Sequence, residues 1–326
     1  MLVKTLGILY SYGCNFQCQH CSVNASPRLI PQVLPIDVLR KVIDEAYYVP
    51  SIRVIVFTGG EPTLHPEHLR FGIEYASRRG FITRLVTNAW WARTYDRARE
   101  FLSELRGLGL RELNISVDDF HMVFLRRFGG LGNVVNAVRA ALDLGLTVVV
   151  GTVKVLGSEI TTKYLREVFR DVEDKVYFQE DFATPIGRAA VLKSLVPRYK
   201  PSEIKGGCPH VGTLAIHPDG SVTICCGHAA MPNTDYGKFF VIGNVVSEDL
   251  RSIINRFYRN ALAWYLFVRG PQSLLAKLNP DEEVANTCEA CYLLVTKYRD
   301  SLVKLSLRKE ELFKALLSNR DIDDLL

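Results

Sequence analysis

Three cysteines near the N-terminus, Cys14, Cys18 and Cys21, have the spacing C-x3-C-x2-C. Cysteine thiolates are the usual ligands of iron–sulfur clusters, and a cubane cluster contains four irons. Three thiolates on one short loop leave one of these irons without a protein ligand. A substrate or cosubstrate can bind at that open position. The spacing therefore predicts a catalytic 4Fe–4S cluster more than a structural cross-link.

A structural zinc site is the alternative for this loop. Zinc requires four ligands, which are commonly two C-x2-C pairs. His20 is a candidate fourth ligand, but it immediately precedes Cys21, so its side chain would have to turn back along the loop. An electron-carrying ferredoxin would require a run such as C-x2-C-x2-C-x3-C-P, which the sequence lacks. The pattern favours the three-thiolate cluster.

A second motif, Thr-Gly-Gly-Glu-Pro at residues 58–62, follows a short apolar run. With the cysteine loop, it resembles the signature of the radical S-adenosylmethionine (SAM) superfamily. In that family the open iron binds the amino and carboxylate groups of SAM, and the cluster donates an electron that cleaves SAM. The 5′-deoxyadenosyl radical then abstracts hydrogen from a substrate. The resemblance implies that the SAM amino group is held by Gly59, Gly60 and Glu61.

One residue departs from the family pattern. The residue before the third cysteine is often aromatic in relatives, and here it is His20. An imidazole ring can still lie flat against a bound adenine, so the resemblance holds.

Composition and charge exclude several classes of protein. Of 326 residues, 48% are hydrophobic and 23% charged, which is ordinary for a globular protein. The 40 basic and 35 acidic residues give a net charge of +5, and the basic residues are scattered. Nucleic-acid binding is therefore not expected, because it requires a concentrated basic stripe.

The sequence also predicts where the protein is found. No apolar stretch reaches membrane-spanning length, and residues 1–10 are too short for a signal peptide. Eight cysteines without an export signal favour metal ligation over disulfides. We therefore expect a cytoplasmic protein with oxygen-sensitive clusters and no membrane association.

Strand-like and helical periodicities alternate through the first half of the chain. Strands at such spacing predict βαβ units around a parallel sheet, and hence the α/β class. Six strands suit a partial (β/α)6 TIM-like barrel, which is the fold that the resemblance implies. The expected strands lie within residues 1–10, 52–57, 81–87, 113–117, 147–155 and 176–178.

Polar residues follow the third and fourth of these strands. In α/β barrels the reacting groups gather at the C-terminal ends of the strands. Asn88 is a short polar group that could face the cavity there. Ser116 and Asp118 lie on one side of their strand. They could bind the SAM ribose hydroxyls, as that position does in relatives, or cap the next helix.

Three further residues near this end have open roles. His121 is either a substrate contact or a structural histidine. Arg126 or Arg127 could pair with the SAM carboxylate, with surface exposure as the alternative.

The second half of the chain has a different organisation. Residues 218–220, Pro-Asp-Gly, predict a β-hairpin between strands at 213–217 and 221–224. We expect a barrel over residues 1–190, a connector over 191–207 and a smaller α+β domain over 208–298. An amphipathic helix over 299–326 ends the chain; it carries Leu302, Leu305, Leu312, Phe313 and Leu316.

The later cysteines resemble the SPASM/twitch extensions of radical SAM enzymes, which hold auxiliary iron–sulfur clusters. The resemblance implies a second, fully ligated 4Fe–4S cluster, with a four-cysteine zinc site as the alternative. Cys226 is the odd thiol: it could replace Cys225 as ligand, be inert, or donate hydrogen to a substrate radical. The expected ligands are Cys208, Cys225, Cys288 and Cys291.

A fully ligated auxiliary cluster is suited to accepting an electron, so we expect net oxidation. The expected substrate is a peptide or a protein, and a small-molecule dehydrogenase or an epimerase is the alternative. A non-catalytic iron–sulfur or zinc-binding protein is the alternative of another class. Expected partners are a reductant such as ferredoxin or flavodoxin. A separate leader-peptide-binding protein is also expected, because only thirteen residues precede Cys14.

Overall fold

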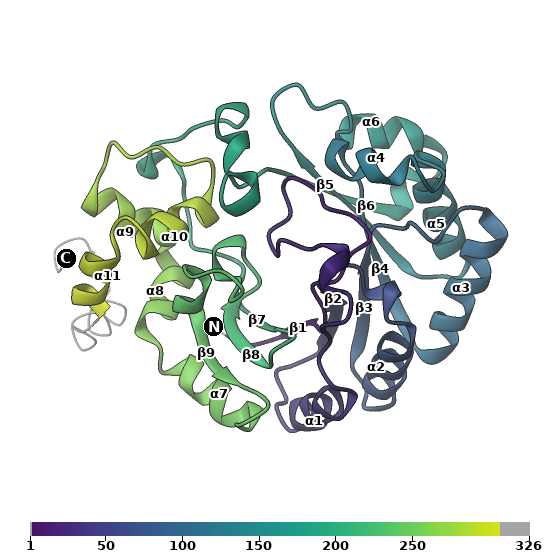
Figure 1. Ribbon diagram of the computed structural model, residues 1–326, viewed down its shortest axis with the longest axis horizontal. Coiled ribbons are helices and arrows are strands. Elements are labelled where there is room, and N and C mark those ends of the chain that lie inside the picture. Colours follow the sequence, from purple (N-terminus) through teal and green to yellow (C-terminus); the bar gives the residue numbers. More distant parts are fainter. Residues whose placement is uncertain (1, 307–326) are drawn as a thin grey trace.

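The structure, a computed structural model, describes residues 2–306. These residues form one nine-stranded sheet with the strand order β6-β5-β4-β3-β2-β1-β7-β8-β9. Figure 1 shows helices outside the curve of the sheet in both halves, and the loop that follows β1 between the two halves.

The first six strands all pair in parallel with one another along the sheet. The predicted α/β barrel fold with six strands is confirmed, and the observed strands differ from the expected ones only near their ends. The strands are β1 (Thr5–Leu9), β2 (Val54–Thr58), β3 (Ile82–Thr87), β4 (Leu110–Ser116), β5 (Thr147–Lys154) and β6 (Val176–Phe182).

Helices alternate with these strands because their apolar residues recur on one face. In the first helix, Leu39, Val42, Ile43 and Ala46 are buried against the sheet. The helices are α1 (Ile36–Tyr47), α2 (Pro66–Arg78), α3 (Tyr95–Leu108), α4 (Asp119–Leu125), α5 (Leu131–Asp143) and α6 (Thr162–Val168).

The predicted hairpin is present as β7 (Val211–Ile216) and β8 (Ser221–Cys225), which pair antiparallel. The third strand of this part, β9 (Val241–Asn244), was not expected as a strand. Strand β7 pairs in parallel with β1, so the sheet of the second half continues the sheet of the barrel.

The segment predicted as a connector, residues 191–207, has little regular structure. It contains the end of the 3-10 helix η4 (Gly187–Leu195) and the short helix η5 (Pro201–Glu203). An isolated bridge between Tyr199 and Val284 ties it to the second half. The domain boundaries at 190, 207 and 298 remain predictions.

Five helices complete the second half: α7 (Leu250–Tyr258), α8 (Ala261–Arg269), α9 (Pro271–Leu278), α10 (Thr287–Val295) and α11 (Arg299–Ser306). Within the predicted final helix, Leu302 is buried and Leu305 lies in α11. Leu312, Phe313 and Leu316 lie outside the described residues. Across residues 2–306, every helix is too short or too polar to cross a lipid bilayer.

Candidate metal and cofactor sites

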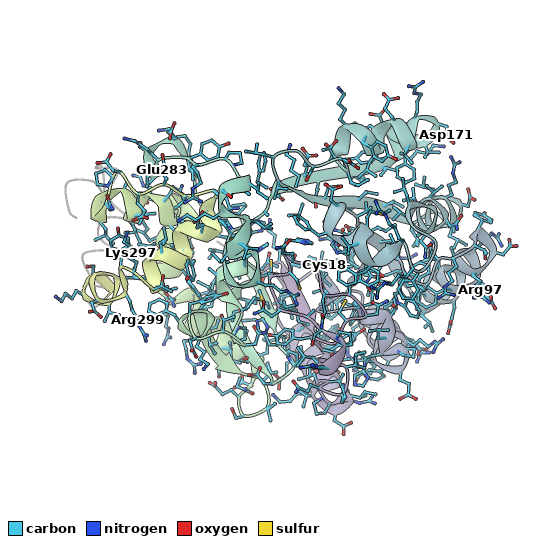
Figure 2. The ribbon with its side chains drawn as sticks, turned by 45° about the horizontal axis from the view of Figure 1, so that its top comes forward. Cys18, Arg97, Asp171, Glu283, Lys297 and Arg299 are labelled. Carbon is cyan, nitrogen blue, oxygen red and sulfur yellow. The ribbon has the colours of Figure 1, made fainter. Side chains whose placement is uncertain are left out.

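A cavity of about 220 Å³ opens at the C-terminal ends of the barrel strands. The three cysteines of the N-terminal loop line it, and Figure 2 shows Cys18 near the middle of the molecule. Cys14 and Cys18 are buried, and Cys21 is half-buried. Four other residues predicted for SAM binding also line this cavity: Gly59, Gly60, Asn88 and Ser116.

The Gly-Gly-Glu turn lies directly against the cysteine loop. The backbone N–H of Gly60 donates to the Ser11 carbonyl at 2.8 Å, and that of Glu61 donates to the Gly13 carbonyl at 2.8 Å. Gly59 has φ +131°, a conformation that favours glycine. A Cβ at Gly60 would lie 2.0 Å from the Gly13 carbonyl oxygen. Glycine is therefore required for this close approach.

The Glu61 side chain lies behind the cavity wall and does not line it. It is 1% exposed, and burial raises the pKa of its carboxyl group. One carboxylate oxygen accepts hydrogen bonds from the hydroxyls of Thr63 (2.7 Å) and Thr87 (2.8 Å). The other accepts from the backbone N–H of Asn88 at 2.8 Å. In this arrangement Glu61 fixes the end of β3, and its contact with the SAM amino group remains a prediction.

The hydrogen bond from its backbone N–H to Glu61 holds Asn88 next to the cysteine loop. Its side-chain amide donates to the Asn15 side chain at 3.0 Å and lies 3.8 Å from the Cys14 sulfur. The carboxylate of Glu61 thus orients a polar group next to a predicted metal ligand.

Asp118 also lies behind the cavity wall, in contact with two histidines that line it. Its carboxylate lies 2.9 Å from His121 Nδ1 and 3.5 Å from His20 Nε2, and it accepts the backbone N–H of His121 at the start of α4. Among the alternatives left open for Asp118, helix capping is therefore present. The predicted contact of Asp118 with the SAM ribose remains untested.

The three groups differ in charge. Burial alone would raise the pKa of Asp118, but the contacts with His121 and His20 lower it to about 2. Burial opposes protonation of His121, yet Asp118 and Cys18 raise its pKa well above the usual value. Burial lowers the pKa of His20 to about 3, so this ring is neutral. It packs on the Phe120 ring at 4.8 Å.

Two arginines that were candidates for SAM binding lie outside the cavity, and one histidine that lines it was not predicted. Arg126 and Arg127 are exposed and do not line the cavity. His228 lines it from the second half of the chain, and the sequence analysis missed this residue. Its position three residues after Cys225 was the available signal. Burial lowers the pKa of His228 to about 4, so its imidazole is neutral.

A second, small cavity of about 20 Å³ contains the other predicted ligands. Cys208, Cys225, Cys288 and Cys291 all line it, with mostly apolar neighbours such as Phe240. Cys226 does not line it and is exposed. Successive residues of an extended chain point to opposite sides, which explains how adjacent cysteines separate in this way.

The chemistry of this donor set fits a metal. Burial raises the pKa of Cys288 to about 12 and the pKa of Cys225 and Cys291 well above the usual range, and the neighbouring thiols add to this effect. Four such thiols become thiolates together only when a cation compensates their charge. A Cβ at Gly227 would lie 3.2 Å from the Cys288 sulfur and 3.5 Å from the Cys225 sulfur, so the backbone closes tightly over the site.

Comparison with protein families gives two matches. The radical SAM superfamily matches residues 8–172, just over half of the chain. The iron–sulfur cluster-binding domain named SPASM matches residues 208–292. The first match contains the three-cysteine loop, and the second contains the four cysteines of the small cavity. The cofactors are thus a three-cysteine 4Fe–4S cluster, an auxiliary 4Fe–4S cluster and SAM.

Two relatives cover nearly the whole chain. YydG of Bacillus subtilis (strain 168), whose name gives it a proposed role in peptide biosynthesis, is 21% identical over 305 residues, which cover 89% of this chain and 92% of YydG. The solved structure of polyhistidine-tagged anSMEcpe with bound AdoMet has a TM-score of 0.55 at 13% identity, and covers 93% of this chain and 99% of that one. The structural likeness shows the fold.

Replacing Gly60 with Ala should prevent assembly of the catalytic cluster. The added Cβ would collide with the Gly13 carbonyl and push the cysteine loop away. Iron should fall from about eight to about four atoms per chain, because the auxiliary site is untouched. Iron analysis after anaerobic reconstitution measures this. Gly132→Ala, whose Cβ meets open space, is the control, and full iron in the Gly60 variant would contradict the steric argument.

Replacing Asp118 with Asn should destabilise the protein in a pH-dependent way. The raised pKa of His121 gives stability that is complete below its unfolded pKa of about 6.5 and is lost as pH rises through the folded pKa. The lowered pKa of Asp118 gives stability that is lost only as pH falls from about 4 toward 2. The loss in the variant should be largest, about 3 kcal/mol, between about pH 4 and pH 6.5.

Urea denaturation across this pH range measures the effect. Asp96→Asn, an exposed change at the start of α3, controls for the loss of one negative charge. A destabilisation of Asp118→Asn that is constant up to about pH 9 would show that the Asp118–His121 pair is not ionic.

Proposed function

This chain belongs to the radical SAM superfamily, and on that premise we propose that it oxidises a peptide or protein substrate by hydrogen abstraction. The auxiliary cluster would accept the remaining electron. The observation that carries this proposal is the position of His228. This residue lines the SAM cavity and follows Cys225, a ligand candidate of the auxiliary site, by three residues.

Residues of the chain would position SAM for the first half of the reaction, the abstraction of hydrogen. Bound cluster and SAM supply a 5′-deoxyadenosyl radical, which abstracts a hydrogen atom from the substrate. The backbone of Gly59 and Gly60 forms the wall on which SAM would rest. Asn88 and Ser116 present polar groups to the same space. Phe16 packs on the rings of Phe124 and Phe128, which helps to keep water from this wall.

The separation between His228 and the auxiliary cysteines suits the second half of the reaction, the transfer of the remaining electron. Three residues of extended chain span at most about 11 Å, so a substrate beside His228 lies close to the auxiliary cysteines. Loss of an electron to that site and of a proton to solvent would complete a two-electron oxidation. The buried, four-thiolate character of the auxiliary site supports its role as acceptor, because it offers no position for substrate.

The choice of a peptide or protein rests on the relative YydG. That protein matches over most of both chains, and its name refers to peptide biosynthesis. As partners we propose a reductant such as ferredoxin or flavodoxin and, for a substrate with a leader, a separate leader-binding protein.

The proposal predicts that the protein cleaves SAM and that its product is lighter than the substrate by two hydrogens. Protein reconstituted with iron and sulfide under anaerobic conditions should form 5′-deoxyadenosine from SAM and dithionite. Short peptides encoded beside the gene are the substrates to test, and mass spectrometry should show the loss of two hydrogens. Iron-replete protein that forms no 5′-deoxyadenosine would contradict an enzymatic role.

A second candidate function is epimerisation of a peptide residue. Cys226 is exposed and stays outside the four-cysteine cavity. It is two residues from His228, so their Cα atoms lie at most about 7 Å apart. A thiol at this place could return a hydrogen atom to the substrate radical from the opposite side, and the thiyl radical left behind would regain an electron from the proposed reductant and a proton from solvent. Epimerisation leaves the mass of the product unchanged.

Replacing Cys226 with Ala separates the two functions. If the enzyme epimerises, the variant should keep both clusters and SAM cleavage but lose the product, and the wild type in D₂O should add one deuterium. If the enzyme oxidises, the variant should retain the two-hydrogen loss. Cys225→Ala is the matched comparison, because it should lose about four irons.

A further inference from the structure

A groove of about 640 Å³ lies beside β9, the last strand of the sheet, and the helices α7 and α8. Figure 1 shows these three elements in the same half of the molecule. We call this groove the β9 groove. Its floor is apolar, and its rim carries amides and arginines. It is lined by Ile224, Phe239, Phe240, Val241, Ile242, Ser252, Asn255, Arg256, Arg259, Asn260, Ala261 and Leu262.

The floor of the β9 groove is also a wall of the auxiliary site. Ile224 and Phe240 line both the groove and the four-cysteine cavity, and both are almost fully buried. A single layer of side chains therefore separates a molecule in the groove from the auxiliary cluster.

The groove is cationic. Among the described residues that line it, Arg256 and Arg259 are the charged ones and none is a carboxylate. Arg256 pairs with Glu248 at 2.5 Å. Arg259 is exposed, and no ion pair joins it to another residue in the part of the chain that the structure describes.

The free edge of β9 is already covered. The Ile242 carbonyl accepts a hydrogen bond from Arg256, and the Asn244 N–H donates to Glu248 at 3.1 Å. A partner would not add a strand at this edge, because these groups are occupied. It would bind through its surface charges and through apolar contact with the floor.

We propose that the β9 groove docks an acidic one-electron carrier protein that exchanges electrons with the auxiliary cluster. The inference rests on the proposed function. In each oxidation the substrate gives one hydrogen atom to the 5′-deoxyadenosyl radical, one proton to solvent and one electron to the auxiliary cluster. That cluster cannot accept a second electron until the first has left, and the carrier takes it.

Binding of a flavodoxin, an acidic carrier, to the reconstituted holoenzyme tests the docking. Arg259→Glu should weaken its affinity about tenfold, because like charges then face each other at the rim. Arg97→Glu is the matched control: it makes the same charge change at an exposed site on α3, at the far edge of the molecule (Figure 2). Arg259→Gln should give an intermediate affinity. Fluorescence anisotropy at low and high salt measures all three.

Electron transfer gives a second readout. Enzyme reduced by dithionite and then desalted should convert oxidised flavodoxin to its semiquinone, and Arg259→Glu should slow the second-order rate about tenfold. Freeze-quenched electron paramagnetic resonance spectra should show that the auxiliary cluster is the one oxidised. SAM cleavage with dithionite should stay unchanged, because dithionite needs no docking site.

Several results would overturn the docking proposal. Equal affinities for Arg259→Glu and Arg97→Glu would do so, as would oxidation of the catalytic cluster alone. Competition with flavodoxin by an acidic substrate leader, or by a second copy of the chain, would assign the groove to that occupant instead. Failure of SAM cleavage in every variant, with docking intact, would fault the proposed function and not the docking.

Discussion

The close contact between the cysteine loop and the turn after β2 is the constraint on which the catalytic site depends. Two backbone hydrogen bonds, from Gly60 to Ser11 and from Glu61 to Gly13, hold the two loops side by side. Since the Cβ position of Gly60 falls on the Gly13 carbonyl, no other residue fits there. The buried carboxylate of Glu61 also accepts hydrogen bonds from Thr87, the last residue of β3, and from Asn88, which follows it. The predicted metal ligands and the cavity wall on which SAM would rest are therefore held by the same set of contacts.

Pairing of β7 with β1 extends this framework to the auxiliary site. The cysteine loop leaves the C-terminal end of β1, and Cys225 ends the strand that pairs antiparallel with β7. The continuous sheet therefore fixes the spacing between the two metal sites, which a flexible linker between separate domains would leave variable. Electron transfer over a fixed short distance is compatible with this construction. The irregular segment around η4 connects the halves, but the sheet sets their geometry.

Sequence periodicity predicted the barrel well, because buried parallel strands are continuous apolar runs and their helices carry one apolar face. Pairing of β7 with β1 was not predictable, since both edges of a strand look alike in sequence. The four auxiliary cysteines were expected from the resemblance to SPASM/twitch extensions, and the sequence left the choice between Cys225 and Cys226 open. The placement of Glu61 and Asp118 behind the cavity could not be predicted. It depends on where the fold places their partners, Thr87 for Glu61 and His121 for Asp118. His228 was missed because its one signal, a position three residues after Cys225, does not show that the side chain reaches the other cavity.

The adjacent cysteines at the end of β8, Cys225 and Cys226, lie in different surroundings. Cys225 turns into the apolar cavity with three other thiols, where its burial makes it useful only as a metal ligand. Cys226 is left on the accessible side, near the residue that lines the SAM cavity. Under the two proposed functions, a substrate radical beside His228 would have two alternatives: a cluster that takes an electron or a thiol that gives a hydrogen atom. The outcome would then depend on which of the two lies closer to the bound substrate.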